Sequence, residues 1–270
     1  MTDKIIETLE CPLCGSAFSL TENGKSLVCG GARHHCWDIA SGGFVNFCGS
    51  HGGDLKEAVA ARRDFLSLGC YKPLADRIAG ILGTLAPEEP VCDAGCGEGY
   101  YSEAIARGGH SVFGFDLSRP AVSAAAKRRL PDSFFSVAGI NGMPVRGCCF
   151  GGLVNIFAPC FEDEFSRVLK TGGIMILAGA GARHLYELKA AIYDEPNENT
   201  VRADLPTRLT FLGREELTYR FSLERQEDIR ALFAMTPYYY RTSFSDAGRL
   251  ASYDRLDVTA DFEIYVYRKD

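Results

Sequence analysis

The chain has 270 residues, of which 46% are hydrophobic and 24% are charged, and its formal net charge is −6. This composition is typical of a globular protein and excludes a disordered or collagen-like chain. The length predicts one large domain, or one with a small appendage. Because the net charge is negative, any contact with nucleic acid requires a local basic patch.

Two features favour a cytoplasmic protein with no membrane partner. The residues after Met1 show no signal-peptide pattern, and no apolar run approaches the roughly 20 residues of a membrane-spanning helix. The 11 cysteines are an odd number in a large chain. They favour reduced thiols or a metal site over a disulfide framework.

The first fifty residues predict a small module that binds zinc. Cys11 and Cys14 form a C-x2-C pair, and a second pair of ligands follows about fifteen residues later, at Cys29 and His35. This Gly/Cys/His-rich segment has little helical periodicity and cannot build a core from side chains alone. A tetrahedral zinc site would supply the missing folding energy.

The neighbours of His35 leave the fourth ligand open, because His34 and Cys36 could take its place. Four protein ligands leave no open position for water, so we expect a structural or recognition role for the zinc and not Lewis-acid chemistry. Residues 49–53 predict a flexible connection between a module of residues 1–50 and a domain of residues 51–270.

The sequence pattern of the second domain predicts an α/β fold. Two helices are expected within 55–85, broken near Gly69. From Pro90, short apolar strands alternate with helices, which is typical of a parallel sheet with crossover helices. The expected strands are 91–92, 111–115, 134–137, 153–157 and 174–178, and the helices are 101–107, 120–130, 161–169 and 183–193. The tail predicts an irregular polar insertion, a strand, a helix and a late antiparallel strand, at 194–207, 217–223, 226–233 and 261–267.

A glycine-rich turn follows the first of these strands. Residues 93–99 read Asp-Ala-Gly-Cys-Gly-Glu-Gly, and the glycines let the backbone approach a ligand and bend into the next helix. A dinucleotide fold would show G-x-G-x-x-G, and Asp93 would repel a pyrophosphate. Asp93 suits a ligand with a cationic end, such as S-adenosylmethionine.

A second acidic residue, Asp116, closes the next strand about 20 residues after the glycine turn. A carboxylate at this position can accept hydrogen bonds from the two ribose hydroxyls of a nucleotide. Taken alone, such a residue is as often a helix N-cap. Together with the glycine turn, it predicts a contact to the cofactor.

Residues 93–99 with Asp116 resemble the first two motifs of class I S-adenosylmethionine-dependent methyltransferases. More narrowly, the chain resembles the RlmA family of 23S ribosomal RNA guanine-N1-methyltransferases, over nearly its whole length. The motifs are Cys11-Pro12-Leu13-Cys14, His35-Cys36-Trp37-Asp38, Gly43-Phe44-Val45-Asn46, Ala61-Arg62-Arg63-Asp64-Phe65-Leu66, Gly69 with Tyr71 and Pro73-Leu74, Gly97-Glu98-Gly99-Tyr100-Tyr101, Ala158-Pro159-Cys160, Arg183-His184-Leu185 and Met235-Thr236-Pro237.

The resemblance implies a Rossmann-like class I methyltransferase fold, mostly parallel with a late antiparallel strand, and an N-terminal zinc module that recognises RNA. It implies methyl transfer from S-adenosylmethionine to N1 of a guanine in a hairpin loop of 23S rRNA, by a homodimer with no DNA partner. It makes Cys11, Cys14, Cys29 and His35 the zinc ligands and adds cofactor contacts to those of the glycine turn. The expected cofactor site is Tyr71, Asp93, Gly95, Gly97, Glu98, Asp116 and His184.

The loop of residues 155–160 follows the fourth strand, at the sheet edge where open α/β folds bind ligands. We expect either Asn155 or backbone carbonyls near Pro159 to accept hydrogen bonds from the edge of the acceptor base. Phe157 could stack on that base or pack in the core. In the family an arginine often stands where this chain has Asn155. No single general base stands out.

The densest positive cluster before the middle of the chain is Arg62, Arg63 and Lys72. With the zinc module it predicts a surface that holds RNA, although such a run is more often a solvated face. Two other functions stay open. A small-molecule methyltransferase would bind its acceptor in a closed apolar pocket, and a non-enzymatic zinc-dependent RNA-binding protein would not need the glycine turn with its two acidic strand ends.

Overall fold

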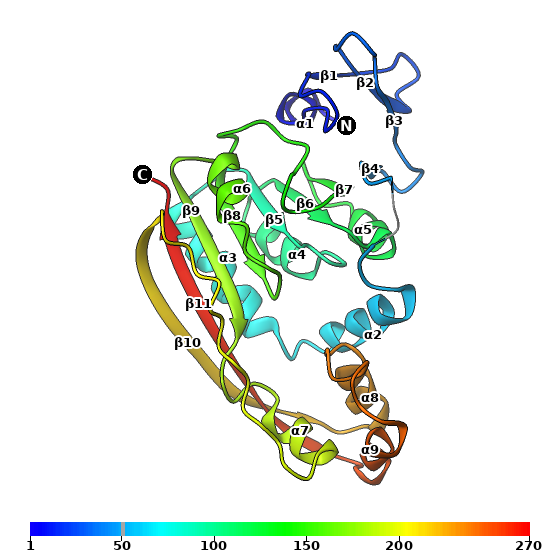
Figure 1. Cartoon of the computed structure of the whole chain (residues 1–270), viewed down its shortest axis with the longest axis vertical. Coiled ribbons are helices and arrows are strands. Elements are labelled where there is room, and N and C mark those ends of the chain that lie inside the picture. The colour runs from blue at the N-terminus through cyan, green and yellow to red at the C-terminus, as the bar shows by residue number, and fades with distance from the viewer. Residues whose placement is uncertain (50–51) are drawn as a thin grey trace.

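A computed structural model of the chain describes residues 1–49 and 52–270. Its centre is an eight-stranded sheet of order β10-β11-β9-β8-β5-β6-β7-β4 (Figure 1). The strands are β4 (Val45–Asn46), β5 (Val91–Ala94), β6 (Val112–Asp116), β7 (Phe134–Val137), β8 (Phe150–Ile156), β9 (Leu169–Ala180), β10 (Thr210–Leu223) and β11 (Leu256–Arg268). All neighbours from β4 to β9 pair in parallel, whereas β11 pairs antiparallel with both β9 and β10. The predicted sheet, mostly parallel with a late antiparallel strand, is confirmed.

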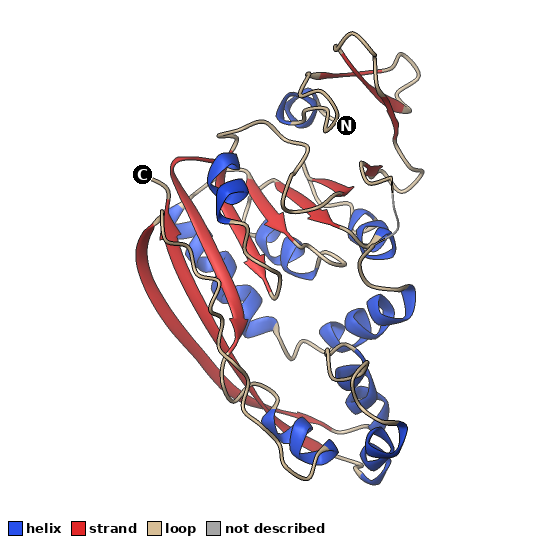
Figure 2. Ribbon diagram, viewed as in Figure 1, coloured by secondary structure: helices blue, strands red, loops and turns tan. Residues whose placement is uncertain are grey.

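Helices flank the parallel part of the sheet, and the others, apart from a short helix in the N-terminal segment, gather toward one end of the long β10–β11 ribbon (Figure 2). They are α2 (Lys56–Ser67), α3 (Lys72–Leu85), α4 (Tyr100–Arg107), α5 (Arg119–Ala126), α6 (Glu162–Val168), α7 (Tyr186–Ile192), α8 (Gln226–Ala234) and α9 (Phe244–Gly248), with a 3₁₀ turn at Arg249–Ser252. The predicted break near Gly69 is confirmed, because this residue has φ +80° between α2 and α3. None of the described helices is long and apolar enough to cross a membrane.

The antiparallel strands are longer than predicted. The sequence predicts a strand at 217–223, whereas β10 begins at Thr210 and pairs with β11 along nearly its whole length. Residues 214–216 are Arg-Glu-Glu, which reads as a polar loop in one dimension. In the sheet the Arg214 guanidinium lies 2.5 Å from the buried Glu263 carboxylate of β11. This ion pair between neighbouring strands allows a polar sequence to form part of β10.

The N-terminal segment has secondary structure that its periodicity did not predict. It contains α1 (Asp3–Thr8) and a three-stranded antiparallel sheet of β1 (Phe18–Leu20), β2 (Ser26–Cys29) and β3 (Cys36–Asp38). Its apolar residues Leu9, Leu27 and Phe47 share one core cluster with Phe134 and Phe150 of the large sheet. β4 extends that sheet beside β7. The expected division at residue 50 stays a prediction, and residues 50–51 of the expected linker lie outside the described part of the chain.

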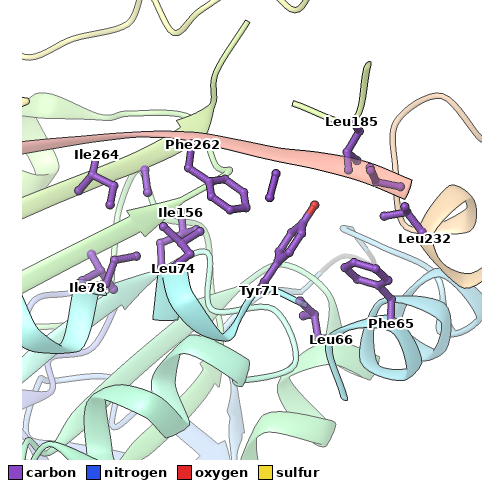
Figure 3. Packing of buried hydrophobic residues seen from close by; sticks show 14 of the residues in the cluster. Phe65, Leu66, Tyr71, Leu74, Ile78, Ile156, Leu185, Leu232, Phe262 and Ile264 are labelled. Carbon is purple, nitrogen blue, oxygen red and sulfur yellow. The ribbon is translucent and has the colours of Figure 1, made fainter. Parts of the chain in front are cut away.

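A second core cluster places Tyr71 at the start of α3. Figure 3 shows this side chain rising toward β11, between Phe65 of α2 and Phe262 of β11. Its ring centroid lies 5.1 Å from that of Phe65 and 5.0 Å from that of Phe262, both in edge-to-face geometry. These contacts hold the Tyr71 ring in one orientation.

Candidate functional site

A cavity of about 900 Å³ opens at the edge of the sheet where β5, β6, β8 and β9 end. Parallel strands bring their carboxyl ends to one edge, so loops that are distant in sequence meet there. Six of the seven predicted cofactor residues line this cavity, namely Tyr71, Gly95, Gly97, Glu98, Asp116 and His184. Asp93 and Asn155 do not.

The glycine turn forms one wall of the cavity with its backbone. Gly95 has φ +89°, and a Cβ placed there would lie only 2.8 Å from the Cβ of Ala158 in the loop after β8. Gly97 has φ +53° and no heavy atom within 4 Å of its Cβ position, so it faces open space. Side chains at these positions would be strained and would fill the space left for a ligand.

Asp116 lies directly beside the turn. Its Oδ2 accepts a hydrogen bond from the Gly97 N–H at 3.0 Å, and its Oδ1 accepts one from the Ser118 N–H at 2.7 Å. Burial raises the pKa of this carboxyl, although the two N–H donors partly offset that effect. Each oxygen keeps a lone pair that can accept a ribose hydroxyl. The arrangement suits the predicted contact, which stays a prediction.

Asp93 is buried near the end of β5. β5 is buried on both faces, and the Asp93 carboxylate accepts a hydrogen bond from the Ser102 hydroxyl of α4 at 2.5 Å. Asp93 is only 2% exposed and, unlike the other predicted cofactor residues, lies outside the cavity lining. It ties the end of β5 to α4. The predicted contact to the cofactor stays a prediction.

Burial also raises the pKa of Asp93 to about 7. The unfolded carboxyl titrates near 3.8, so between these values the native state binds more protons and stability falls as pH rises. Asparagine does not titrate. We therefore expect the free energy of unfolding of the wild type to fall by about 1 kcal/mol more than that of Asp93→Asn when the pH rises from 6 to 8.5. Urea unfolding of both proteins at the two pH values measures this difference. A pH-independent difference would contradict the raised pKa.

Tyr71 and His184 meet in the cavity wall, although 113 positions separate them in sequence. The Tyr71 Oη lies 2.9 Å from the His184 Nε2, and the His184 Nδ1 accepts a hydrogen bond from the Asp261 N–H at 3.2 Å. Burial lowers the pKa of His184 to about 4, so the ring is neutral at pH 7. The Asp261 contact assigns the ring proton to Nε2, which donates to Tyr71 and leaves the Tyr71 hydroxyl hydrogen for another acceptor.

Glu98 brings an unused acceptor to the lining. One of its carboxylate oxygens pairs with the Arg128 guanidinium, whereas Oε1 is buried without a hydrogen-bond partner. Burial raises the pKa of this carboxyl, and Arg128 opposes that effect. A buried polar atom without a partner is unfavourable in free energy. A ligand with a hydrogen-bond donor near this atom would satisfy it.

Asn155 is fully buried at the end of β8. Its Nδ2 donates to the carbonyl oxygens of Ala94 at 3.0 Å and Pro159 at 3.2 Å, and its Oδ1 accepts from the Arg202 Nη2 at 3.0 Å. These bonds fasten the loop after β8 to the end of β5. Both amide hydrogens of Asn155 are used within the protein and the residue does not line the cavity, which favours a positioning role. The expected contact to the acceptor base stays a prediction.

Phe157 lies in the same loop but faces the cavity. Its side chain is 46% exposed, and its backbone has φ +55°. A non-glycine residue in this region is strained, and such strain is often found at functional sites. The ring centroid lies 6.0 Å from that of His184. Of the two predicted roles, exposure favours stacking on a ligand over core packing.

The polar insertion supplies cavity residues that sequence reasoning missed. Residues 194–207 form no helix or strand, as predicted. Asn199 fastens the insertion to the loop before α7, because its Nδ2 donates to the His184 carbonyl at 2.7 Å. The lining residues of the insertion are Asn199, Thr200, Arg202 and Asp204. A dense run of hydrogen-bonding side chains in an irregular stretch was the only signal in the sequence.

The predicted zinc ligands come together in the N-terminal segment. The ligand atoms of Cys11, Cys14, Cys29 and His35 all lie within 4.8 Å of one another. His35 Nδ1 is 3.5 Å from the Cys11 sulfur and 3.6 Å from that of Cys29, and the Cys14 and Cys29 sulfurs are 3.6 Å apart. Tetrahedral zinc with normal bond lengths requires ligand separations of about 3.6–3.8 Å. The donor set and its spacing therefore fit zinc, with His35 as the fourth ligand.

The predicted basic cluster is largely paired within the protein. The Arg62 guanidinium lies 2.5 Å from the Asp54 carboxylate, and Arg63 lies 3.3 Å from that of Asp64. Lys72 forms an ion pair with Asp76 one helical turn away. These pairs reduce the attraction for phosphate and favour the alternative of a solvated face. A role in RNA binding stays a prediction.

Comparison with known proteins shows similarity to methyltransferases. Residues 85–220, about half of the chain, match the family described as "Methyltransferase domain". The chain is 30% identical over 277 residues to a Bacillus subtilis protein provisionally named 23S rRNA (guanine-N(1)-)-methyltransferase YxjB, with 96% of each chain covered. It is 29% identical over 251 residues to the 23S rRNA (guanine(748)-N(1))-methyltransferase of Streptomyces fradiae, covering 88% of this chain and 87% of that one.

A solved structure supports the fold. A methyltransferase from Anaeromyxobacter dehalogenans, provisionally classed as type II, superposes with a TM-score of 0.56 at 20% identity, covering 72% of this chain and 95% of that one. At this identity the likeness concerns the fold alone. The closer relationship is shown by the sequence similarity over nearly the full length of the chain. The chain belongs to the 23S rRNA (guanine-N(1)-)-methyltransferase family and has the class I methyltransferase fold.

Proposed function

We propose that the protein transfers a methyl group from S-adenosylmethionine to N1 of a guanine in a hairpin loop of 23S rRNA, in the cytoplasm. One observation carries the proposal. The chain matches a relative named for this reaction over 96% of both lengths, so the similarity includes the N-terminal segment as well as the methyltransferase core. A small-molecule methyltransferase would need only the core.

The residues of the cavity fit the cofactor. Asp116 would accept the ribose hydroxyls, and the backbone of the turn at Gly95 and Gly97 would approach the methionine part closely. S-adenosylmethionine, when bound, supplies a methyl group on a sulfonium sulfur, and the transfer forms the N1–carbon bond, breaks the carbon–sulfur bond and releases the N1 proton. Such an activated methyl group leaves the protein mainly the task of positioning.

The acceptor side of the cavity suits a single unpaired base. Guanine N1 lies on the Watson–Crick edge and is inaccessible in a duplex, so the target must be in a loop or flipped out. The exposed ring of Phe157 offers a stacking surface beside the Tyr71–His184 pair. The zinc site would hold the N-terminal segment in a fixed shape for contact with the surrounding RNA. The homodimer implied by the resemblance stays a prediction.

Primer extension on 23S rRNA tests the proposal, because a methyl group on N1 blocks base pairing and stops the polymerase. We expect cells that contain the gene to show one stop that is absent after deletion and returns on complementation. An identical stop pattern with and without the gene would contradict the proposal. In that case, turnover of S-adenosylmethionine with a small acceptor would favour the small-molecule alternative, and an absence of cofactor binding would favour the RNA-binding alternative.

A further inference from the structure

Four carboxylates line the cavity, and three of them lie beside the glycine turn. Asp116 bonds to the turn itself, and Glu98 is part of it and pairs with Arg128. Asp54 pairs with Arg62, and its carbonyl oxygen accepts from the hydroxyl of Ser118, next to the end of β6. The fourth, Asp204, comes from the polar insertion.

Asp204 is held against the loop after β8, on the acceptor side. Its Oδ2 accepts from the Cys160 N–H at 2.9 Å, and its Oδ1 accepts from the Arg202 Nε at 2.7 Å. Arg202 in turn donates to the Ala158 carbonyl at 2.5 Å and to Asn155 Oδ1 at 3.0 Å. The Arg202 side chain is only 9% exposed. A buried guanidinium therefore fixes the position of the Asp204 carboxylate relative to the end of β8.

The hydrogen bonds to Asp204 keep its carboxylate ionised and leave one of its oxygens able to accept a further bond. Burial would raise the pKa of its carboxyl, but the bonds from Arg202 and Cys160 outweigh burial and hold the pKa below its usual value. The group is therefore ionised at neutral pH and can only accept hydrogen bonds. Its side chain is 48% exposed, and Oδ1 accepts one bond within the protein, which leaves a lone pair for a ligand.

The other side-chain acceptors on this side are neutral, and several of them already take part in hydrogen bonds within the protein. The His184 ring nitrogens bond to Tyr71 and to the Asp261 N–H, and the Asn155 oxygen accepts from Arg202. Asn199 Oδ1 accepts from the Tyr238 hydroxyl. Among the described lining residues away from the glycine turn, Asp204 is therefore the charged acceptor available to a substrate.

Guanine is the base that matches such an acceptor. Its N2 amino group is a hydrogen-bond donor next to N1, whereas adenine has no amino group at that position. We propose that Asp204 accepts a hydrogen bond from the N2 amino group of the target guanine and thereby selects guanine and aligns N1. This inference rests on the proposed function and adds the residue that determines base specificity.

Inosine tests the contact, because it is guanosine without the N2 amino group. The substrate is a hairpin RNA that carries the guanine mapped by primer extension, or inosine in its place. We expect wild-type kcat/KM to fall about tenfold to a hundredfold on inosine, the effect of losing one hydrogen bond to a charged group. In Asp204→Asn and Asp204→Ala, kcat/KM on the guanine RNA should fall by a similar factor. Replacing guanine with inosine should lower the kcat/KM of these variants only slightly further.

A matched control and a binding measurement separate this role from a structural one. Asp194→Asn changes an exposed carboxylate of the same insertion that pairs with Arg249 outside the cavity lining, so it should keep wild-type discrimination. Calorimetry should give unchanged affinity for S-adenosylmethionine in all variants. If the Asp204 variants discriminate between guanine and inosine by the same ratio of kcat/KM as the wild type, the carboxylate does not contact the amino group and the inference is overturned. If the wild type methylates neither this hairpin nor 23S rRNA, the proposed function itself fails.

Discussion

Replacing Gly97 with valine is expected to abolish binding of S-adenosylmethionine. Gly97 has φ +53°, and its Cβ position faces the open cavity with no atom within 4 Å. A β-branched side chain is strained at this φ and would occupy the space beside the glycine turn. We expect the dissociation constant to rise by at least ~100-fold, equivalent to about 2.7 kcal/mol. Isothermal titration calorimetry measures it.

The control for Gly97→Val is the same substitution at a glycine that needs no special conformation. Gly83 lies on the exposed side of α3, has no positive φ and has no atom within 4 Å of its Cβ position. Gly83→Val should leave helix stability unchanged or slightly raised, because valine has a higher helix propensity than glycine, and should leave cofactor affinity within about twofold of the wild type. Thermal unfolding should show both variants folded. Wild-type affinity in folded Gly97→Val would show that the turn does not approach the cofactor.

The parts of the site that could be predicted are those encoded locally. Gly95 and Gly97 belong to one turn, and Asp116 is placed by the length of a single strand–helix–strand unit. The zinc ligands are likewise determined by short spacings in one segment. In each case the chain between the residues is too short to place them elsewhere, so pattern and geometry agree.

The parts that could not be predicted depend on distant partners. Nothing near Asn155 in sequence shows that Arg202 will occupy its side-chain oxygen from 47 residues away. Asp93 looks like a strand-end residue, but it lies one position before the end of β5, where both faces of the sheet are covered. The Tyr71–His184 pair was accessible only through the family resemblance, because no local pattern connects residues 113 positions apart.

The insertion shows the same limit on a larger scale. Its sequence correctly predicts irregular structure, since it lacks an apolar period. Without a period, however, no face can be assigned to it, and the direction of Asp204 is decided by hydrogen bonds to the loop after β8. Catalytic and binding residues are often found on such loops, held by a rigid scaffold. Sequence reasoning identifies the scaffold more readily than the loop that completes the site.

Removal of zinc is expected to unfold the N-terminal segment and to expose part of the large sheet. The protein should contain one zinc per chain when purified without added metal, as measured by elemental analysis. Structural zinc sites bind with apparent free energies of about 10–16 kcal/mol, and in this segment that free energy would stabilise three short strands. Because Leu9 and Phe47 share a core cluster with Phe134, loss of the metal should also destabilise the β4–β7 edge.

Two neighbouring histidines provide the variant and its matched control. His35→Ala removes the Nδ1 that lies 3.5 Å from the Cys11 sulfur, so it should lower zinc content and the midpoint of thermal unfolding strongly. His34→Ala changes an exposed residue outside the ligand cluster and should affect neither by much. Hydrogen exchange would show in His35→Ala a loss of protection in β1–β3 that extends to β4. A stoichiometry near zero in the wild type, with these strands still protected, would mean that the segment folds without a metal and that the four ligands only lie close together.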